Sequence, residues 1–514
     1  MKRIVGSKAS RVWLLFAILA VGTIAGPIIL AVVYAPQYGF LTVPIASWLF
    51  LALAGWAVVF AGGTGAWLWR RLRRAQGELA DRTKQPLESH TPAVSGYKLL
   101  DQAEFLPIIQ TLFTSLAGTR FIQARPLPGG HGGSKTVRVK LQREGDDAPL
   151  PRAFVVKLGD RREMAGEYDK FQKHARWHLG RAARFFRHAE WGDLAGIAYE
   201  FVGLDTQHEI QSLHQFYAGH AAVEISELIG RAYAHLGQAW YRNGYIAPTD
   251  LYLEYGLLNR KADRIISHVG EIVDEDDDYR LNFAGVEERL RPNLKPGFCP
   301  DLDIPWHDPV AFIRAWPGRR AIIPAHRSTV HGDLHAQNVL VEIARNGQKH
   351  VWFIDFSHTG NGLSQARTTE AQREGTLADP DRGHTLRDFC RLEADVKFIL
   401  TRLQKEEDLR LALAFERELL VGGMALADWS QHAPPVEGLQ EERFQKAWHV
   451  VREIRRQAAG YLARPDDLRP YYFGLLHATL PIVYYHPTQF EGQLCERIQK
   501  QYALLAAGMA CSQL

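Results

Sequence analysis

The stretch that decides the fold reads HGDLHAQNVL at residues 331–340, and FIDF follows at residues 353–356. The apolar runs 338–343 and 350–355 predict two short strands. Between them, an Asn-Gly pair at 346–347 is typical of a tight hairpin turn, because both residues tolerate positive φ. The sequence therefore predicts a hairpin whose open end carries the polar residues of both quoted pieces.

Three of those polar residues match the needs of phosphoryl transfer. That reaction requires a carboxylate that orients the acceptor hydroxyl and takes its proton, and oxygen ligands that hold Mg²⁺ against the phosphates of ATP. Asp333 suits the first task, whereas Asn338 and Asp355 suit metal ligation through an amide and a carboxylate oxygen. The alternative is that all three are ordinary turn residues at strand ends. Their joint match to one division of labour favours a phosphotransferase that uses ATP and Mg²⁺.

This segment resembles the Brenner-type motif of aminoglycoside phosphotransferase and choline kinase-like enzymes, and it looks most like the ternary complex associated domain branch. The resemblance covers most of residues 96–514. It implies an α+β, two-lobed protein-kinase-like fold, with a small antiparallel sheet lobe, a large helical lobe and ATP between them. It also implies that Asp333 is the catalytic base, that Asn338 and Asp355 bind magnesium, and that Asp388 is a buried carboxylate bracing the catalytic loop. The alternative for Asp388 is a first-turn helix residue favoured by the helix dipole.

The region before this motif contains a glycine-rich turn, PGGHGGSK at 128–135, between two predicted strands. Glycines let backbone N–H groups approach phosphate oxygens closely. The spacing is not that of a P-loop, and a flexible hairpin turn is the alternative. We expect the nucleotide phosphates to contact four residues of this turn, Gly130, Gly132, Gly133 and Ser134.

A lysine and a glutamate are expected to complete the catalytic group. Lys157 ends an apolar strand and matches the kinase lysine that contacts nucleotide phosphates. Its partner should be a glutamate of the next helix, either Glu167 or, one turn earlier on the same face, Glu163. Glu200 and Val202 lie in a segment that resembles the hinge between kinase lobes, where adenine bonds to the backbone.

Two long apolar runs precede the catalytic region. Each is long enough to cross a bilayer as a helix, and basic residues flank both outer ends, which places these ends in the cytoplasm. A cleaved signal peptide is the alternative. The prediction is a multi-pass protein of the inner membrane with its catalytic domain in the cytoplasm. Its parts are a transmembrane hairpin at 1–74 (spans 12–35 and 42–69), a linker at 75–96, an N-lobe at 97–204, and a C-lobe at 205–514 that contains an insertion at 205–329.

The charge composition limits the kinds of partner that the chain is expected to bind. The chain has 61 basic and 57 acidic residues, and the net charge of +4 is too small to indicate a nucleic-acid partner. The expected partners are a nucleotide, an unknown small-molecule or protein acceptor, membrane lipid and a multi-protein assembly. Three functions stay open: an active phosphotransferase, a nucleotide-binding pseudokinase that acts as a signalling or conflict-system scaffold at the membrane, and aminoglycoside phosphorylation.

Overall fold

The computed structural model divides the chain into two compact units, residues 1–89 and residues 90–514. The described residues all belong to the second unit and begin at residue 93. They run to residue 514 with gaps, the main ones being 96–104, 127–134, 144–148, 181–183, 202–208, most of 256–321, most of 364–378 and most of 421–440.

The expected membrane spans, 12–35 and 42–69, lie outside the described residues. Among the residues that are described, no helix combines the length and the apolar character needed to cross a bilayer. The prediction of a multi-pass protein of the inner membrane is corrected accordingly, because the described residues contain no helix that supports it.

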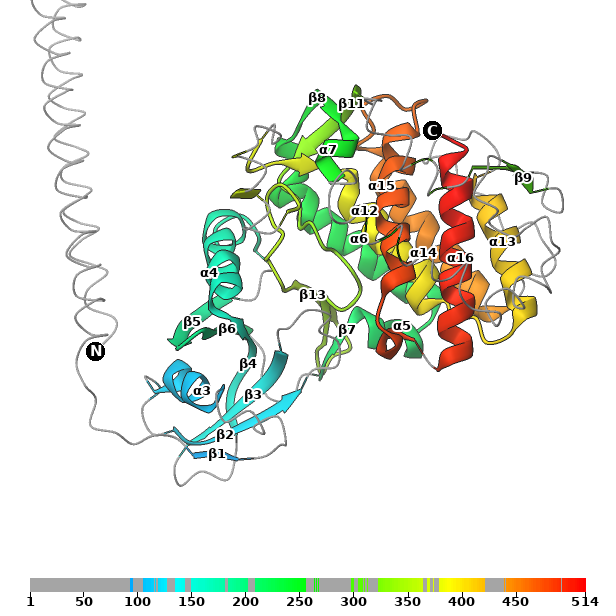
Figure 1. Cartoon of the computed structure of the whole chain (residues 1–514). Coiled ribbons are helices and arrows are strands. Elements are labelled where there is room, and N and C mark those ends of the chain that lie inside the picture. The colour runs from blue at the N-terminus through cyan, green and yellow to red at the C-terminus, as the bar shows by residue number, and fades with distance from the viewer. Residues whose placement is uncertain are drawn as a thin grey trace, which may run out of the picture. The chain divides into compact units, whose positions relative to one another are not determined.

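A six-stranded sheet forms the first part of the unit (Figure 1). Its strand order is β1-β2-β3-β4-β6-β5, and every neighbouring pair is antiparallel except the parallel pair β1 and β2. The first strand lies in the stretch expected to be a linker, so the sheet begins earlier than predicted. The strands are β1 (Ala93–Ser95), β2 (Thr119–Pro126), β3 (Lys135–Arg143), β4 (Pro149–Asp160), β5 (Arg184–Trp191) and β6 (Leu194–Phe201).

Helix α3 (Phe105–Phe113) packs on one face of this sheet, and strand β4 shows how the two faces are divided. Phe154, Val156 and Leu158 belong to the core shared with α3, whereas Val155 belongs to the large core of the helical part. Side chains alternate between the faces of a strand. Lys157 must therefore lie on the face that points away from α3.

Helix α4 (Arg161–Lys170) follows β4 directly. The Asp160 side chain caps it by accepting the backbone N–H groups of Arg162 and Glu163. The helix continues as the π-helical turn η2 (Phe171–Ala175), whose Phe171 is buried in the large core. The cap fixes where α4 starts, and this start sets which of its side chains reach Lys157.

Two three-stranded antiparallel sheets connect this part to the helices. One has the order β13-β12-β7 and contains the expected hairpin, and the other has the order β14-β11-β8. A short antiparallel pair, β9 and β10, lies apart from them. The strands are β7 (Glu209–Ser212), β8 (Tyr245–Asp250), β9 (Gly297–Cys299), β10 (Ile304–Trp306), β11 (Ile322–Ser328), β12 (Val339–Ile343), β13 (Lys349–Phe353) and β14 (Gly383–His384).

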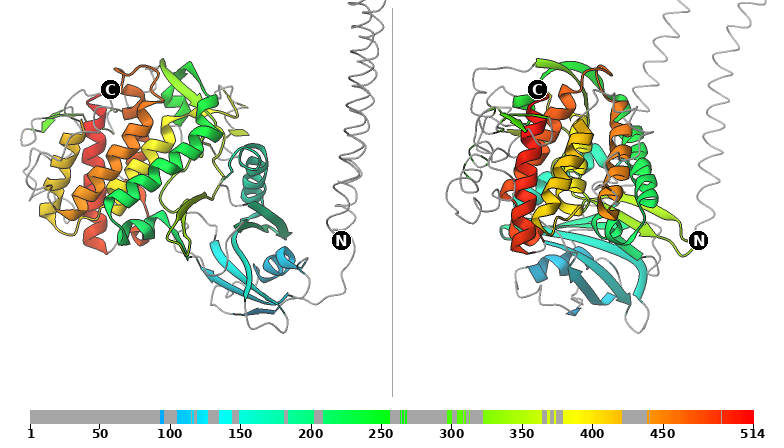
Figure 2. Two further views of the ribbon diagram at one scale, coloured as in Figure 1. Left: turned by 180° about the vertical axis from the view of Figure 1, so that it is seen from behind. Right: turned by 90° about the vertical axis from the view of Figure 1, so that its right-hand side faces the viewer.

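The remaining helices pack around one large apolar core (Figures 1 and 2). Helix α6 is typical, because its Ile225, Leu228, Ile229 and Leu236 recur at helical spacing and are all buried. The helices are α5 (Leu213–Gly219), α6 (Ala222–Ala239), η3 (Tyr241–Asn243), α7 (Leu251–Tyr255), α12 (Leu386–Asp395), η7 (Val396–Leu400), α13 (Glu406–Leu420), α14 (Glu442–Ala459), α15 (Arg469–Thr479), η10 (Leu480–Tyr484), η11 (Pro487–Gln489) and α16 (Gln493–Cys511). The result is a mixed α+β architecture with antiparallel sheets, which fits a kinase-like fold.

Candidate active site

Lys157 of β4 lies between two carboxylates. Its Nζ is 2.8 Å from Oε2 of Glu167 and 2.8 Å from Oδ2 of Asp355. The strand β4, the helix α4 that follows it and the loop after β13, which is distant from both in sequence, therefore meet at one ammonium group. The structure thus brings together three of the expected site residues, Lys157, Glu167 and Asp355.

The structure chooses between the two candidate glutamates. Glu163 lies in the first turn of α4 and is exposed, whereas Glu167 is fully buried. The hydroxyl of Tyr199, on β6, donates to Oε1 of Glu167 at 2.8 Å, so each carboxylate oxygen of Glu167 has a partner. A buried carboxylate is stable only when it is paired and hydrogen-bonded, and Glu167 meets both conditions.

Asp355 has an unusual backbone conformation. Its φ is +63°, and it is the one non-glycine residue with positive φ among the described residues. Such a conformation persists only where the surroundings hold it, and here Ser357 donates its hydroxyl to Oδ1 at 2.7 Å while Lys157 holds Oδ2. Phe356 packs against Phe171 of the α4–η2 helix. The loop after β13 is thus fixed to the helix that carries Glu167.

Asp333 lies in the loop before β12, and α12 holds its side chain. Arg391 of α12 donates from Nε to Oδ1 of Asp333 at 2.9 Å. The other oxygen, Oδ2, is 3.7 Å from Nε2 of His335. About a third of the Asp333 side chain is exposed (32%), so a reactant can reach the carboxylate.

Asn338 connects Asp333 to the hairpin. Its side-chain amide nitrogen donates to the backbone oxygen of Asp333 at 2.8 Å, and its backbone carbonyl oxygen accepts the N–H of Ile354 at 3.1 Å. Ile354 is the residue before Asp355, and the next pair along the hairpin, Val339 and Phe353, is in register. Asp333, Asn338 and Asp355 therefore share the open end of the β12–β13 hairpin.

Asp388 braces the start of this loop. Its two carboxylate oxygens accept the backbone N–H groups of His331 and Gly332 at 2.7 and 2.8 Å, and the Tyr241 hydroxyl adds a third bond at 2.8 Å. Gly332 has a φ of +86°, and a Cβ there would lie 2.5 Å from the carbonyl oxygen of His358. The turn therefore requires glycine, and Asp388 has the bracing contacts that the resemblance implied.

Charge pairing decides the protonation of the site. Burial lowers the pKa of Lys157, but the carboxylates of Asp355 and Glu167 outweigh burial and hold this pKa well above its usual range. Burial raises the pKa of Asp355, but Lys157 outweighs it and holds the pKa of that carboxyl well below its usual range. Arg391 has the same effect on the pKa of Asp333. Burial lowers the pKa of the nearby His358 to about 4. At neutral pH Lys157 is therefore an ammonium, Asp333 and Asp355 are ionised carboxylates, and the His358 imidazole is uncharged.

The donor set at the hairpin end suits magnesium. Mg²⁺ prefers hard oxygen ligands and usually takes one or two from protein, with phosphate and water supplying the rest. Asn338 and Asp355 offer one amide and one carboxylate at the same end of the hairpin. In the described part of the chain, no group of three or more His, Cys, Asp or Glu side chains is arranged to hold a metal ion.

The predicted nucleotide contacts are described only in part. Gly130, Gly132, Gly133, Ser134 and Val202 lie outside the described residues, so their predicted roles stay predictions. Glu200 lies on β6 opposite Phe154 of β4. It is therefore on the strand next to the one that carries Lys157.

Two site residues were not foreseen from the sequence, Arg391 and Asp395. Arg391 contacts the side chain of Asp333, and Asp395 accepts the backbone N–H of Ala336 at 2.8 Å. Together with Asp388, they lie at positions i, i+3 and i+7 of α12, which is one face of a helix. That spacing is the signal that could have found them.

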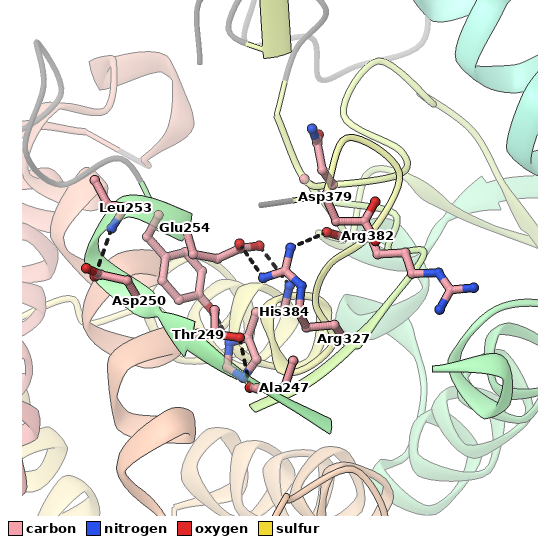
Figure 3. A network of polar contacts seen from close by, with 12 residues as sticks. Ala247, Thr249, Asp250, Leu253, Glu254, Arg327, Asp379, Arg382 and His384 are labelled. Atoms are coloured by element: carbon pink, nitrogen blue, oxygen red, sulfur yellow. Dashed lines mark hydrogen bonds and ion pairs between the residues drawn. The ribbon is translucent and has the colours of Figure 1, made fainter. Parts of the chain in front are cut away.

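A second polar network fixes the start of α12 (Figure 3). Arg327 of β11 donates to Glu254 of α7 at 2.8 Å and to the carbonyl of Arg382. The backbone N–H of His384 donates to the same Glu254 carboxylate at 2.9 Å, and Arg387 donates to the Glu254 carbonyl at 2.8 Å. This network positions the helix that carries Asp388, Arg391 and Asp395.

Comparisons with known proteins give few matches. No protein-family model matches the chain, and no curated protein matches it. Among solved structures, the chain is similar to a thermostable mutant of aminoglycoside phosphotransferase APH(4)-Ia in its apo form, with 13% identity and a TM-score of 0.32. The match covers 78% of this chain and 96% of that one. A likeness this weak does not establish a family for the chain.

Proposed function

We propose that the chain is an ATP- and Mg²⁺-dependent phosphotransferase that transfers the terminal phosphoryl group to a hydroxyl acceptor. The observation that carries this proposal is the position of Lys157, which lies 2.8 Å from both Glu167 and Asp355. Asp333 joins this group through Asn338, whose amide contacts the Asp333 backbone. Catalysis of phosphoryl transfer rests on positioning and charge stabilisation, and these five side chains supply both.

Each residue has a distinct role in the proposed reaction. The Lys157 ammonium, oriented by Glu167, binds the phosphate oxygens of the nucleotide. Asn338 and Asp355 hold Mg²⁺, which neutralises phosphate charge when it is bound. Asp333 orients the acceptor hydroxyl and takes its proton. The glycine-rich turn at 128–135 covers the phosphates, and the segment around Glu200 and Val202 accepts the adenine.

Labelled nucleotide tests the proposal directly. The full chain is incubated with Mg-ATP labelled at the terminal phosphate, and the label is followed both in free phosphate and in products of added hydroxyl compounds. We expect transfer by the unmodified chain and a loss of roughly 100-fold or more in Asp333→Ala, because a group that takes the proton contributes about 10² to 10⁴ in rate. Arg443→Gln is the control, since Arg443 pairs with Asp408 rather than with a site residue.

The outcome also separates catalysis from a pseudokinase. Nucleotide binding with no release or transfer of label by the unmodified chain contradicts the proposal and favours a nucleotide-binding scaffold. Equal rates in the unmodified chain and in Asp333→Ala contradict the role of Asp333.

A further inference from the structure

Helix α12 holds the Asp333 loop at three points along one face. Asp388 accepts the N–H groups of His331 and Gly332, Arg391 contacts the Asp333 side chain, and Asp395 accepts the N–H of Ala336. Two of these contacts fix only backbone. Arg391 differs from Asp388 and Asp395 because it holds the reactive carboxylate itself.

The contact between Arg391 and Asp333 uses one carboxylate oxygen. Nε of Arg391 donates to Oδ1 at 2.9 Å, and Nη1 is buried with no hydrogen-bond partner among the described residues. An arginine placed for stability normally uses its planar fork to hold both oxygens of a carboxylate. Arg455 does so here, because its Nε and Nη2 donate to the two oxygens of Glu393 at 2.8 and 2.6 Å.

The single contact leaves the second oxygen of Asp333, Oδ2, without a hydrogen bond from any described residue. Oδ2 lies 3.7 Å from His335, which is beyond hydrogen-bonding distance, and the Asp333 side chain is partly exposed. The Arg391 guanidinium is itself fixed from another side, 5.9 Å from the centre of the Tyr485 ring. Both side chains of the pair are therefore oriented, and one carboxylate oxygen stays open.

We infer that Arg391 is a positioning residue for the proposed reaction, which fixes Oδ1 of Asp333 so that Oδ2 receives the proton of the acceptor hydroxyl. This inference rests on the proposed function. In the step, the acceptor oxygen forms a bond to the terminal phosphorus of ATP and the bond from that phosphorus to the bridging oxygen breaks. The bond's electron pair leaves with ADP, and the acceptor proton moves to Asp333.

A double-mutant cycle in the full chain tests the inference with water as the acceptor. Release of phosphate from Mg-ATP is measured for the unmodified chain, Arg391→Gln, Asp333→Ala and the double variant. We expect Arg391→Gln to lower kcat by roughly 10- to 100-fold, because a misplaced catalytic group costs up to about 10² in rate. The KM for ATP should change by less than about twofold, since Arg391 acts after the nucleotide is bound.

The decisive comparison is between the two backgrounds. If Arg391 acts through Asp333, then Arg391→Gln adds no loss once Asp333 is alanine, because residues that act as a unit are not additive. A residue that only supports the fold lowers the rate in both backgrounds by the same factor. Arg391→Lys keeps the charge without the planar fork, so we expect it to recover part of the lost kcat.

Three results overturn the inference. They are a kcat for Arg391→Gln equal to that of the unmodified chain, equal losses in both backgrounds, and a loss no larger than that of the control Arg443→Gln. If Arg391→Gln does not fold, Arg391→Lys carries the cycle by the same criteria. Failure of the proposed function is distinguishable, because the unmodified chain then releases no phosphate at all.

Discussion

Two buried clusters of charge share the helix α12–η7, and they are built differently. On one side, Glu393 pairs with both Arg455 and Lys397, and Lys397 also pairs with Glu416 at 2.7 Å. The hydroxyls of Tyr471 and Tyr502 complete this sealed cluster by donating to Glu393 and Glu416. On the other side, Asp333 receives one bond from Arg391 and stays 32% exposed.

The exposed fraction of the charged side chains differs between the two clusters, and this difference indicates which cluster stabilises the fold and which can contact a reactant. The charged side chains of the sealed cluster are at most 3% exposed, so no reactant can reach them. The open cluster at Lys157, Asp333 and Asp355 keeps its carboxylates 26% to 32% exposed. A buried ion pair stabilises only when it is fully satisfied, whereas a catalytic carboxylate must keep an oxygen for the substrate. Substitutions in the sealed cluster should therefore affect folding, and those in the open cluster should affect turnover.

The largest expected effect on stability is that of Arg455→Met. Removing one partner of a buried ion pair leaves an uncompensated charge and costs about 3–5 kcal/mol. The free energy of unfolding from urea titration should fall by this amount, while turnover per folded molecule stays the same. Arg443→Met is the matched control, with an expected loss of about 1 kcal/mol, because its partner Asp408 keeps two backbone N–H donors. Equal losses in the two variants would remove the distinction.

The next effect concerns pH. Burial raises the pKa of Glu393, but Arg455 and Lys397 outweigh burial and lower this pKa from 4.5 to about 2. The folded chain thus binds this proton less tightly than the unfolded chain does. The stability that Glu393 contributes is complete above the unfolded pKa and is lost as the pH falls towards the folded one, by about 3 kcal/mol in total. Urea titrations of the unmodified chain and of Glu393→Gln between these pH values should converge, and parallel curves would contradict this reading.

A smaller effect is expected for Tyr199→Phe. This change removes the 2.8 Å bond to Glu167 and leaves one buried carboxylate oxygen without its donor, which costs about 1–3 kcal/mol. Lys157 stays held by Asp355, so kcat should fall by less than about tenfold. Unfolding and phosphate release are both measured. A loss of turnover as large as that of Asp333→Ala would show that Glu167 depends on Tyr199 far more than this geometry indicates.

The smallest effect is expected for Ser357→Ala. Its hydroxyl donates to Oδ1 of Asp355 at 2.7 Å, but Asp355 is 26% exposed and water can replace the bond. We expect a change of at most about 1 kcal/mol in the free energy of unfolding and a fall in kcat of about twofold to fivefold. A larger loss of stability would mean that water does not replace the lost hydrogen bond to Asp355, and that the loop after β13 depends on this bond.

Sequence patterns predicted the elements whose signals are local. Helix α6 and strand β6 carry such signals, because the apolar residues of α6 recur at helical spacing and those of β6 form a continuous run. Strand β5 (Arg184–Trp191) carries no such signal, since its charged and aromatic residues do not alternate cleanly. The pairing of β8 with β11 joins two segments that are far apart in sequence within the insertion at 205–329, and no local pattern encodes it.

The residues of the candidate site also include some with a local sequence signal and some without one. Asp333, Asn338 and Asp355 were predictable from spacing along a hairpin, and Lys157 with Glu167 from a strand followed by a helix. Arg391 contacts Asp333 across 58 residues of sequence. A charged residue on a helix usually faces solvent, so apart from its spacing with Asp388 no local pattern indicates that Arg391 is buried against the loop.

Under the proposed function, Lys157 binds the phosphates of ATP while the terminal phosphoryl group is transferred. The most direct test is the rate of phosphate release from Mg-ATP by the full chain, compared between the unmodified protein and Lys157→Met at equal folded fraction. We expect a rate at least roughly 100-fold lower in Lys157→Met, because the ammonium stabilises charge on the phosphates. An unchanged rate would contradict the proposed role of Lys157.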